Sequence, residues 1–291
     1  MASPRTESLA PVLGARRDGT AQADSTRGLL VTVLGELVLP AGGAAWTRPL
    51  LGALELLGVR DKAARQALSR LADEGWLERE RHGRRTRWRL TDGSAALLGA
   101  GAERIYGFGQ GRPDWDGRWV VVVATVPERD RSTRYRMGQA LSWAGFGSIG
   151  NGLWVCPWID REAAAVAALA GLGVEAMSFR AEVGAMGTGA DLAARAWDLP
   201  ALASSYRSFL AEVDRSGGAP RSDDGAVERL VRLVHDWRRF PFLDPDLPDE
   251  LLPDGWVGSS AARRFAEERA RLVPHAQRWW RALEERTEAS A

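Results

Sequence analysis

Apolar residues recur at helical spacing between residues 26 and 74 and predict three helices. The three apolar sets are Leu29, Leu30, Val33, Leu34, Leu37 and Val38; Leu50, Leu51, Leu54 and Leu57; and Ala64, Ala67, Leu68 and Leu71. Two strands follow at 76–81 and 84–90, joined by the turn residues His82 and Gly83. Three helices followed by a two-stranded hairpin are typical of a winged helix-turn-helix, which we assign to residues 26–92.

The middle of the chain alternates strands and helices. A Gly- and Ala-rich stretch, 93–114, is interpreted as a connector before a second domain at 115–186. The elements expected in that domain are a strand at 119–126, a helix at 129–143, strands at 147–149 and 153–156, a helix at 161–172 and a strand at 174–183. This βαββαβ order is the split arrangement of ferredoxin-like domains.

From residue 187 to the end, the pattern predicts only helices and connectors. The last helix is expected at 260–285 with an interruption at Pro274, and a Pro-rich acidic connector at 240–256 precedes it. Residues 1–25 are polar without a period and are predicted to be a disordered arm. The fold class is therefore α+β, with a winged helix, a ferredoxin-like domain and a helical C-terminal domain.

Charge and cysteine content narrow the function classes. Among 291 residues, 39 Lys and Arg balance 38 Asp and Glu, so any nucleic-acid binding must come from a local patch. One cysteine excludes an internal disulfide and a multi-thiolate zinc site, and it fits a cytoplasmic location. The three histidines lack metal-ligand spacing, so no metal is expected. No apolar run is long enough to cross a bilayer, so no membrane association is expected.

The third helix carries a polar side suited to DNA bases. Its members are Lys62, Arg65, Gln66, Ser69 and Arg70. Arg can form paired hydrogen bonds to guanine, Gln can do so to adenine, and Ser adapts to either base. These residues lie in the first three turns, the part of a recognition helix that enters the major groove. The alternative is an ordinary solvated helix face.

The hairpin favours DNA binding over that alternative. Six arginines lie between residues 79 and 89 against one acid, Glu80, which makes a local net charge of +5. We interpret this density as serving phosphate contact rather than the fold itself. Arg84 and Arg85 flank the turn and Arg87 follows in the strand, so all three are predicted to touch the DNA backbone or minor groove.

No motif in the sequence indicates catalysis, and we name no catalytic residue. Gly145–Gly150 matches G-x-G-x-x-G, but it follows a helix and precedes strands, which is the reverse of the dinucleotide-binding context. Cys156 lies in an apolar strand and is interpreted as a core residue. No cofactor is therefore expected.

Several stretches resemble the PaaX family, bacterial repressors of phenylacetic acid catabolism. The stretches are Gly42–Thr47, Gln66–Leu71 with Glu74–Leu77, Gly83–Arg85, Trp115–Trp119, Trp143–Gly147 and Phe242–Trp256. The resemblance implies a winged helix, a central domain with the fold of CRISPR-associated Cas2 nucleases, and a helical C-terminal domain. It also implies a dimer that an aryl-acetyl-CoA such as phenylacetyl-CoA releases from its operator. Cas2 nucleases have a metal-binding Asp at the end of the first strand, whereas residues 123–126 have no carboxylate.

A CoA thioester needs cations for its phosphates and an apolar pocket for its acyl group. We nominate a C-terminal cluster, His235, Arg238, Arg239 and Trp256, completed by Arg118 of the central domain. The alternative is that these arginines cover a helix end and that the tryptophan is a core residue.

The combined interpretation is a homodimeric DNA-binding repressor of a phenylacetate-type operon, bound to double-stranded DNA and controlled by phenylacetyl-CoA or a related acyl-CoA. Two other classes stay open at this point. One is an enzyme, either a Cas2-like nuclease or a CoA-ester-processing enzyme. The other is an adaptor whose winged helix binds a protein.

Overall fold

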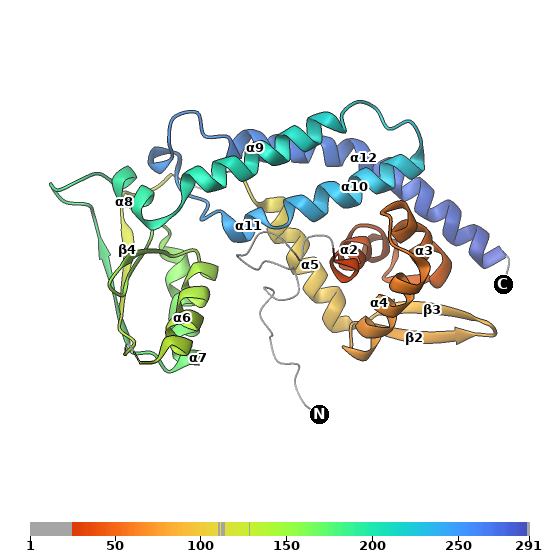
Figure 1. Ribbon diagram of the computed structural model, residues 1–291, viewed down its shortest axis with the longest axis horizontal. Coiled ribbons are helices and arrows are strands. Elements are labelled where there is room, and N and C mark those ends of the chain that lie inside the picture. The colour runs from red at the N-terminus through yellow and green to blue at the C-terminus, as the bar shows by residue number, and fades with distance from the viewer. Residues whose placement is uncertain (1–24, 110, 112–113, 128, 290–291) are drawn as a thin grey trace. The chain divides into compact units, whose positions relative to one another are not determined.

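The computed structural model describes residues 25–109, 111, 114–127 and 129–289 (Figure 1). The predicted disordered arm therefore lies, except for Ser25, outside the described residues. The described chain forms two compact units. The first comprises the chain up to Gly107, Phe209–Arg239 and the chain from Arg263 onward, and the second comprises Phe108–Ser208 and Phe240–Ala262.

The first unit packs helices around a small antiparallel sheet. Its elements are α2 (Thr26–Val33), a π-helical turn η1 (Leu34–Val38), η2 (Leu39–Ala41), β1 (Ala44–Trp46), α3 (Thr47–Leu56), α4 (Asp61–Asp73), β2 (Leu77–His82), β3 (Arg85–Leu90), α5 (Asp92–Gly107) and α10 (Asp223–Trp237). The strand order is β1-β3-β2. Leu30, Leu54 and Leu68 are fully buried where α2, α3 and α4 meet. The predicted apolar sides of these helices therefore form one core.

Two features of the first unit differ from the expectations. The stretch predicted as a connector at 93–114 contains α5, a helix of 16 residues. Thr91 Oγ1 accepts a hydrogen bond from the N–H of Ser94 at 3.2 Å, and Leu98 and Ile105 are buried one above the other. That burial outweighs the cost of about 1 kcal/mol for each helical glycine. In addition, β1 pairs with β3 although no strand was expected there.

Two long helices, α9 (Leu199–Arg215) and α12 (Gly258–Ala289), contribute residues to both units. The predicted interruption at Pro274 is wrong, because α12 continues through this residue. Proline removes one helical hydrogen bond and costs about 3 kcal/mol. Leu272, Ala276 and Trp280 are almost completely buried on either side of it, which offsets that cost.

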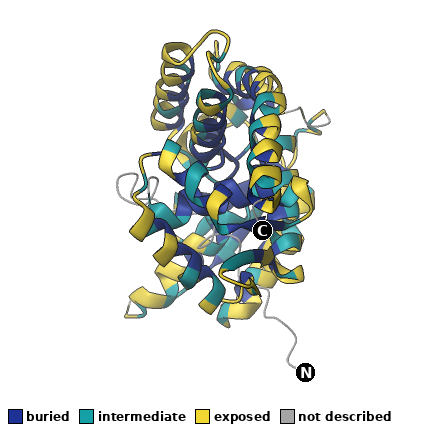
Figure 2. Cartoon of the chain, turned by 90° about the vertical axis from the view of Figure 1, so that its right-hand side faces the viewer, coloured by how far each residue is buried: buried dark blue, intermediate teal, exposed yellow. Residues whose placement is uncertain are grey.

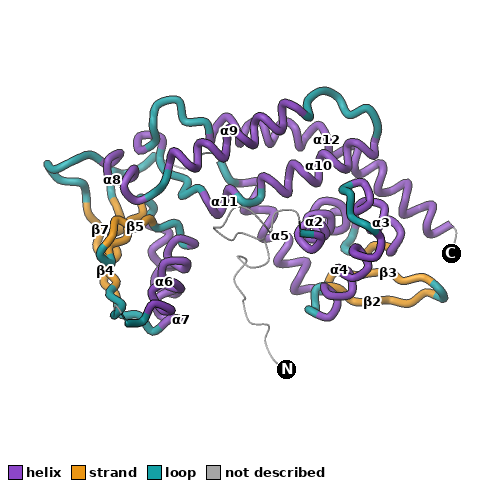
Figure 3. Tube along the Cα trace, viewed as in Figure 1, coloured by secondary structure: helices purple, strands orange, loops and turns teal. Residues whose placement is uncertain are grey.

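The second unit contains a four-stranded antiparallel sheet in the order β5-β6-β4-β7. Figure 3 shows its strands in orange beside α6 and α7. Its elements are β4 (Trp119–Ala124), α6 (Arg131–Trp143), β5 (Gly147–Gly150), β6 (Leu153–Cys156), η3 (Ile159–Arg161), α7 (Glu162–Leu172), β7 (Ala176–Ala181), α8 (Gly189–Ala196), α11 (Phe240–Leu243) and η4 (Asp249–Leu251). Val120 and Val122 of β4 pack with α6 and α7 on one face. Trp119 and Val155 pack with α8 on the other.

Candidate nucleic-acid interface and ligand sites

Helix α4 separates an apolar side from a polar side, as expected from its period. Ala64, Leu68 and Leu71 are completely buried. The polar residues Lys62, Arg65, Gln66 and Arg70 are exposed, and Ser69 is half-buried. Figure 2 shows how closely buried and exposed segments alternate along the helices. The structure therefore leaves most of the predicted base-reading side chains in contact with solvent.

Arg65 is held by a neighbour one helical turn away. Its Nε donates to Asp61 Oδ1 at 2.7 Å, and its Nη2 donates to Asp61 Oδ2 at 3.2 Å. Both side chains are more than half exposed, at 58% and 63%. Such a solvated pair contributes about 0–1 kcal/mol, so Arg65 can exchange Asp61 for another acceptor at little cost.

The hairpin lies next to the polar side of α4. Arg79 of β2 donates from Nη2 to Ser69 Oγ at 3.4 Å, and its guanidinium stacks 4.9 Å from the centre of the Trp88 ring. Arg81 and Arg84 are exposed near the turn, where Gly83 has a positive φ of 60°. The exposed arginines at the tip of the hairpin and the polar side of α4 thus belong to one connected surface.

Three other arginines of the hairpin contact this chain itself. Arg85 Nη1 donates to the backbone oxygen of Thr287, and Arg87 Nη2 lies 3.9 Å from Glu288 Oε1, both near the end of α12. Arg89 Nε donates to Glu80 Oε1 at 2.6 Å, and this hydrogen bond lowers the pKa of Glu80. The interpretation that the hairpin charge serves nothing within the fold is therefore wrong for these three residues. About 200 positions separate the hairpin from α12 in the sequence, and no local pattern links them.

His235 and Arg238, two of the predicted effector residues, are buried at the C-terminal end of α10. Their exposed fractions are 5% and 4%. His235 Nδ1 lies 3.0 Å from Thr32 Oγ1 of α2. Burial, followed by the charge of Arg238, lowers the pKa of His235 to about 3, so this imidazole is neutral at pH 7. Burial also lowers the pKa of Arg238 to about 10, which leaves it charged.

The remaining predicted effector residues have different surroundings. Arg239 follows Arg238 and is half-buried, and both belong to the first unit. Arg118 and Trp256 belong to the second unit. Arg118 Nε lies 3.7 Å from Glu182 Oε1, and the Trp256 ring packs edge-on against Tyr206 at 6.0 Å. The five residues therefore divide between two compact units.

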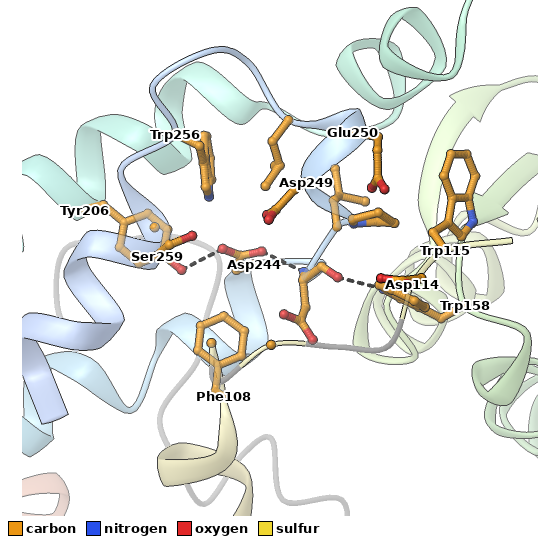
Figure 4. Close-up of a pocket in the computed structure, with 17 residues that line it drawn as sticks. Phe108, Asp114, Trp115, Trp158, Tyr206, Asp244, Asp249, Glu250, Trp256 and Ser259 are labelled. Carbon is orange, nitrogen blue, oxygen red and sulfur yellow. Dashed lines mark hydrogen bonds between the residues drawn. The ribbon is translucent and has the colours of Figure 1, made fainter. Parts of the chain in front are cut away.

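The second unit also contains an acidic pocket that sequence reasoning missed (Figure 4). It has a volume of about 190 Å³, and all charged side chains among the described residues that line it are carboxylates. They are Asp114, Asp244, Asp246, Asp249 and Glu250. Tyr206 donates from its hydroxyl to Asp244 Oδ2 at 2.6 Å, and burial raises the pKa of Asp244 to about 6. Trp256 also lines this pocket.

The only sequence signal for this pocket was the acidic, Pro-rich stretch at 240–256, which was interpreted as a connector. Within the described residues, no three His, Cys, Asp or Glu side chains gather into a possible metal site. None of the described helices combines the length and apolar character that a membrane span requires.

Comparison with known families accounts for nearly all of the described chain. Residues 25–94 match the model of PaaX-like proteins, 112–193 match the central Cas2-like domain of PaaX proteins, and 197–282 match the C-terminal domain of PaaX-like proteins. The second unit thus contains the Cas2-like domain, in agreement with the α+β fold expected from the sequence. The winged-helix assignment stays a prediction.

Two individual proteins are similar along most of their length. The transcriptional repressor PaaX of Escherichia coli K12 is 30% identical over 260 residues, which cover 85% of this chain and 80% of that protein. The solved structure of an uncharacterized protein of Mycobacterium tuberculosis matches this chain with a TM-score of 0.61 and 23% sequence identity. The match covers 89% of this chain and 98% of that protein. The second likeness shows a shared fold. Three family domains and the repressor relative agree with the expectation of a non-enzymatic regulator, and the chain belongs to the PaaX family of transcriptional repressors.

Proposed function

We propose that this protein is a homodimeric repressor that binds the operator of a phenylacetate-type catabolic operon and is released by an aryl-acetyl-CoA. In this proposal α2, α3, α4 and the β2–β3 hairpin act as a winged helix-turn-helix. The observation that carries it is the solvent-exposed polar side of α4 beside the exposed arginines Arg81 and Arg84. α4 enters the major groove, and the hairpin tip contacts the DNA backbone.

The two surfaces have separate roles in DNA binding. Arg65 and Gln66 present donors and acceptors that match base edges, so they supply sequence preference. Arg84 presents charge at a hairpin tip and binds phosphate in any sequence. Arg85 and Arg87 reach DNA only where the end of α12 releases them, because both contact Thr287 or Glu288.

A homodimer is supported by an apolar face on the edge strand β7. Met177 is 64% exposed and Phe179 is 51% exposed. Phe179 pairs with Val121, and Met177 pairs with Val123, so these four side chains lie on the same face of the sheet. A second copy of the chain that covers this face would create a twofold dimer. Such a dimer requires inverted half-sites about 34–36 Å apart, or a multiple of that distance.

The test is a gel shift on the DNA upstream of the protein's own gene, with three variants. Arg65→Ala is expected to lose about 1–3 kcal/mol of binding free energy and to relax the preference at one base pair. Arg84→Ala is expected to weaken binding to all sequences and to reduce the salt slope by about 1. Arg131→Ala, an exposed arginine of α6, serves as the control and binds like the unmodified protein.

Equal losses for Arg65→Ala and Arg84→Ala on every sequence would contradict the division into base reader and phosphate clamp. Binding that does not weaken with added salt would favour an adaptor that recognises protein. Titration of the complex with phenylacetyl-CoA, other acyl-CoA esters and the free acids then identifies the effector class. Cleavage of DNA or release of free CoA would indicate an enzyme instead.

A further inference from the structure

Arg238 is a buried cation with an unsatisfied donor. Its side chain is 96% removed from solvent, and its Nη1 has no hydrogen-bond partner among the residues that the structure describes. The Nε2 atom of the neighbouring His235 is likewise buried and unpartnered within the described residues. Both side chains contact the first turn of α2, where α10 packs on that helix.

Two less buried arginines of the same unit have carboxylate partners. Arg229 donates to Glu268, and Arg269 donates to Glu36 at 3.1 Å, and both carboxylates are only 3% exposed. A charge removed from water is strongly unfavourable unless an opposite charge and hydrogen bonds compensate for it. Arg238 makes no ion pair within 4 Å in the described structure, although it is buried as deeply as those carboxylates, and the attraction of Asp236 from farther away does not offset its burial. The environment of Arg238 therefore favours the arrival of an anion.

The geometry points to a place for that anion at the start of α2. A Cβ atom on Gly28 would lie 3.0 Å from Arg238 Nη2 and 3.1 Å from His235 Cε1, so both side chains closely approach the glycine backbone. Ser25 Oγ caps this turn by accepting from the N–H of Gly28 at 3.1 Å. Backbone N–H groups at a helix N-terminus favour negative charge. A guanidinium and a helix N-terminus thus converge on one small region.

We propose that Arg238 and the N-terminus of α2, beside His235, bind a phosphate group of a CoA-type effector. This inference rests on the proposed function and assigns the phosphate end of the ligand to the first unit. Residues 25–27 at the start of α2 are half-exposed, and we assign this side as the approach for a small phosphate ester. A DNA duplex cannot bring its backbone to a guanidinium that is 96% buried. The acidic pocket of the second unit has carboxylates and no cations among its described lining residues, so it is a poor site for the same phosphate.

The site has a direct connection to the recognition helix. Arg27 lies on α2 beside Arg238, and the two charges repel, which contributes to the lowered pKa of Arg238. Arg27 Nη2 donates to Glu74 Oε2 at 2.8 Å, and Glu74 is the C-cap residue of α4. An anion at Arg238 attracts Arg27 and competes with Glu74 for it. Ligand binding is thereby coupled to the position of α4.

The experiment measures binding of CoA, inorganic pyrophosphate and phenylacetate to the full chain by calorimetry and thermal shift. CoA and pyrophosphate are expected to bind and to raise Tm, whereas phenylacetate, which has no phosphate, does not. Arg238→Met is expected to weaken CoA binding at least about tenfold. Without ligand, its Tm is equal to or above that of the unmodified protein, because a buried unpaired charge is removed. A merely structural arginine would give the opposite change in Tm.

Two further variants make the test independent of folding. Gly28→Ala places a methyl group against Arg238 Nη2 and is expected to weaken CoA binding while the chain stays folded, since alanine favours helices. Arg207→Gln is the control, because Arg207 is an exposed arginine of α9 whose charge contributes to the pKa shift of neither His235 nor Arg238. It is expected to bind CoA like the unmodified protein.

Unchanged CoA affinity in both Arg238→Met and Gly28→Ala would overturn the proposed site. Failure of the unmodified protein to bind CoA and pyrophosphate would do the same. A gel shift without ligand separates this result from the proposed function. If the protein binds the operator but not CoA, the proposed function stands and the proposed phosphate site is wrong. If it binds CoA in a way that depends on Arg238 but does not bind the operator, the phosphate site stands and the proposed repressor function is wrong.

Discussion

The first unit contains two groups of arginines with opposite surroundings. On α4 and at the hairpin tip, Arg65, Arg70 and Arg84 are exposed. At the end of α10, Arg238 is 4% exposed. A solvated guanidinium keeps its hydration and can bind a large polyanion such as DNA. A desolvated guanidinium gains most from one closely fitting anion, because the low dielectric strengthens that interaction.

A third arrangement shows how the fold itself can provide that anion. Glu268 of α12 is 3% exposed and accepts hydrogen bonds from Arg229 and Arg271, and Arg264 Nη1 lies 3.7 Å away. There the chain supplies a carboxylate to every cation, and Arg264 also pairs with Asp214. The function of an arginine in this protein therefore depends on its burial and on whether the fold supplies a carboxylate.

The largest expected effect comes from removing the carboxylate that compensates three cations. Glu268→Gln removes the negative charge that Arg229, Arg264 and Arg271 share. Because these cations then lie close together without it, the substitution is expected to cost about 4 kcal/mol of unfolding free energy. Urea denaturation measures this loss. Glu267→Gln, at the exposed neighbouring position, is the control and is expected to change stability by less than about 0.5 kcal/mol. A loss below 1 kcal/mol for Glu268→Gln would show that the cluster does not stabilise the fold.

A pair of variants on α4 separates folding from recognition. Leu68→Ala removes a completely buried side chain and is expected to cost about 3 kcal/mol of unfolding free energy. Gln66→Ala, on the exposed side, is expected to change stability by less than about 0.5 kcal/mol while reducing operator affinity. Denaturation and gel shifts on both variants measure the two quantities. Unchanged operator affinity in Gln66→Ala would show that Gln66 does not recognise a base.

The smallest expected effect concerns the contact between the hairpin and α12. Glu288 is 54% exposed and lies 3.9 Å from Arg87, so the pair contributes at most about 1 kcal/mol. Glu288→Gln frees Arg87 for phosphate and is expected to raise DNA affinity for all sequences by no more than about fivefold, mostly at low salt. Glu285→Gln, exposed on the same helix, is the control. A loss of affinity in Glu288→Gln would indicate that α12 holds the hairpin in its binding position.

The two sides of α4 could be predicted from the sequence because the helical period is a local property. Ala64, Leu68 and Leu71 share one side of any helix formed by this segment, whatever surrounds it. The same locality explains two errors. The Gly-rich composition suggested a connector where α5 forms, and Pro274 suggested an interruption in α12. Both helices are stabilised because distant residues bury Leu98 or Trp280, and a local pattern contains no information about that burial.

Apart from β1 and α5, the order of helices and strands followed from local sequence patterns, as did the positive charge of the hairpin and the likeness to a repressor family. The tertiary structure decided which cations stay free. Arg85 meets Thr287 at the end of α12, while Arg238 and His235 come together with the start of α2, across more than 200 positions in each case. The free energy of a charge depends on its solvent exposure and its partners, and both are set by contacts that only the folded chain creates.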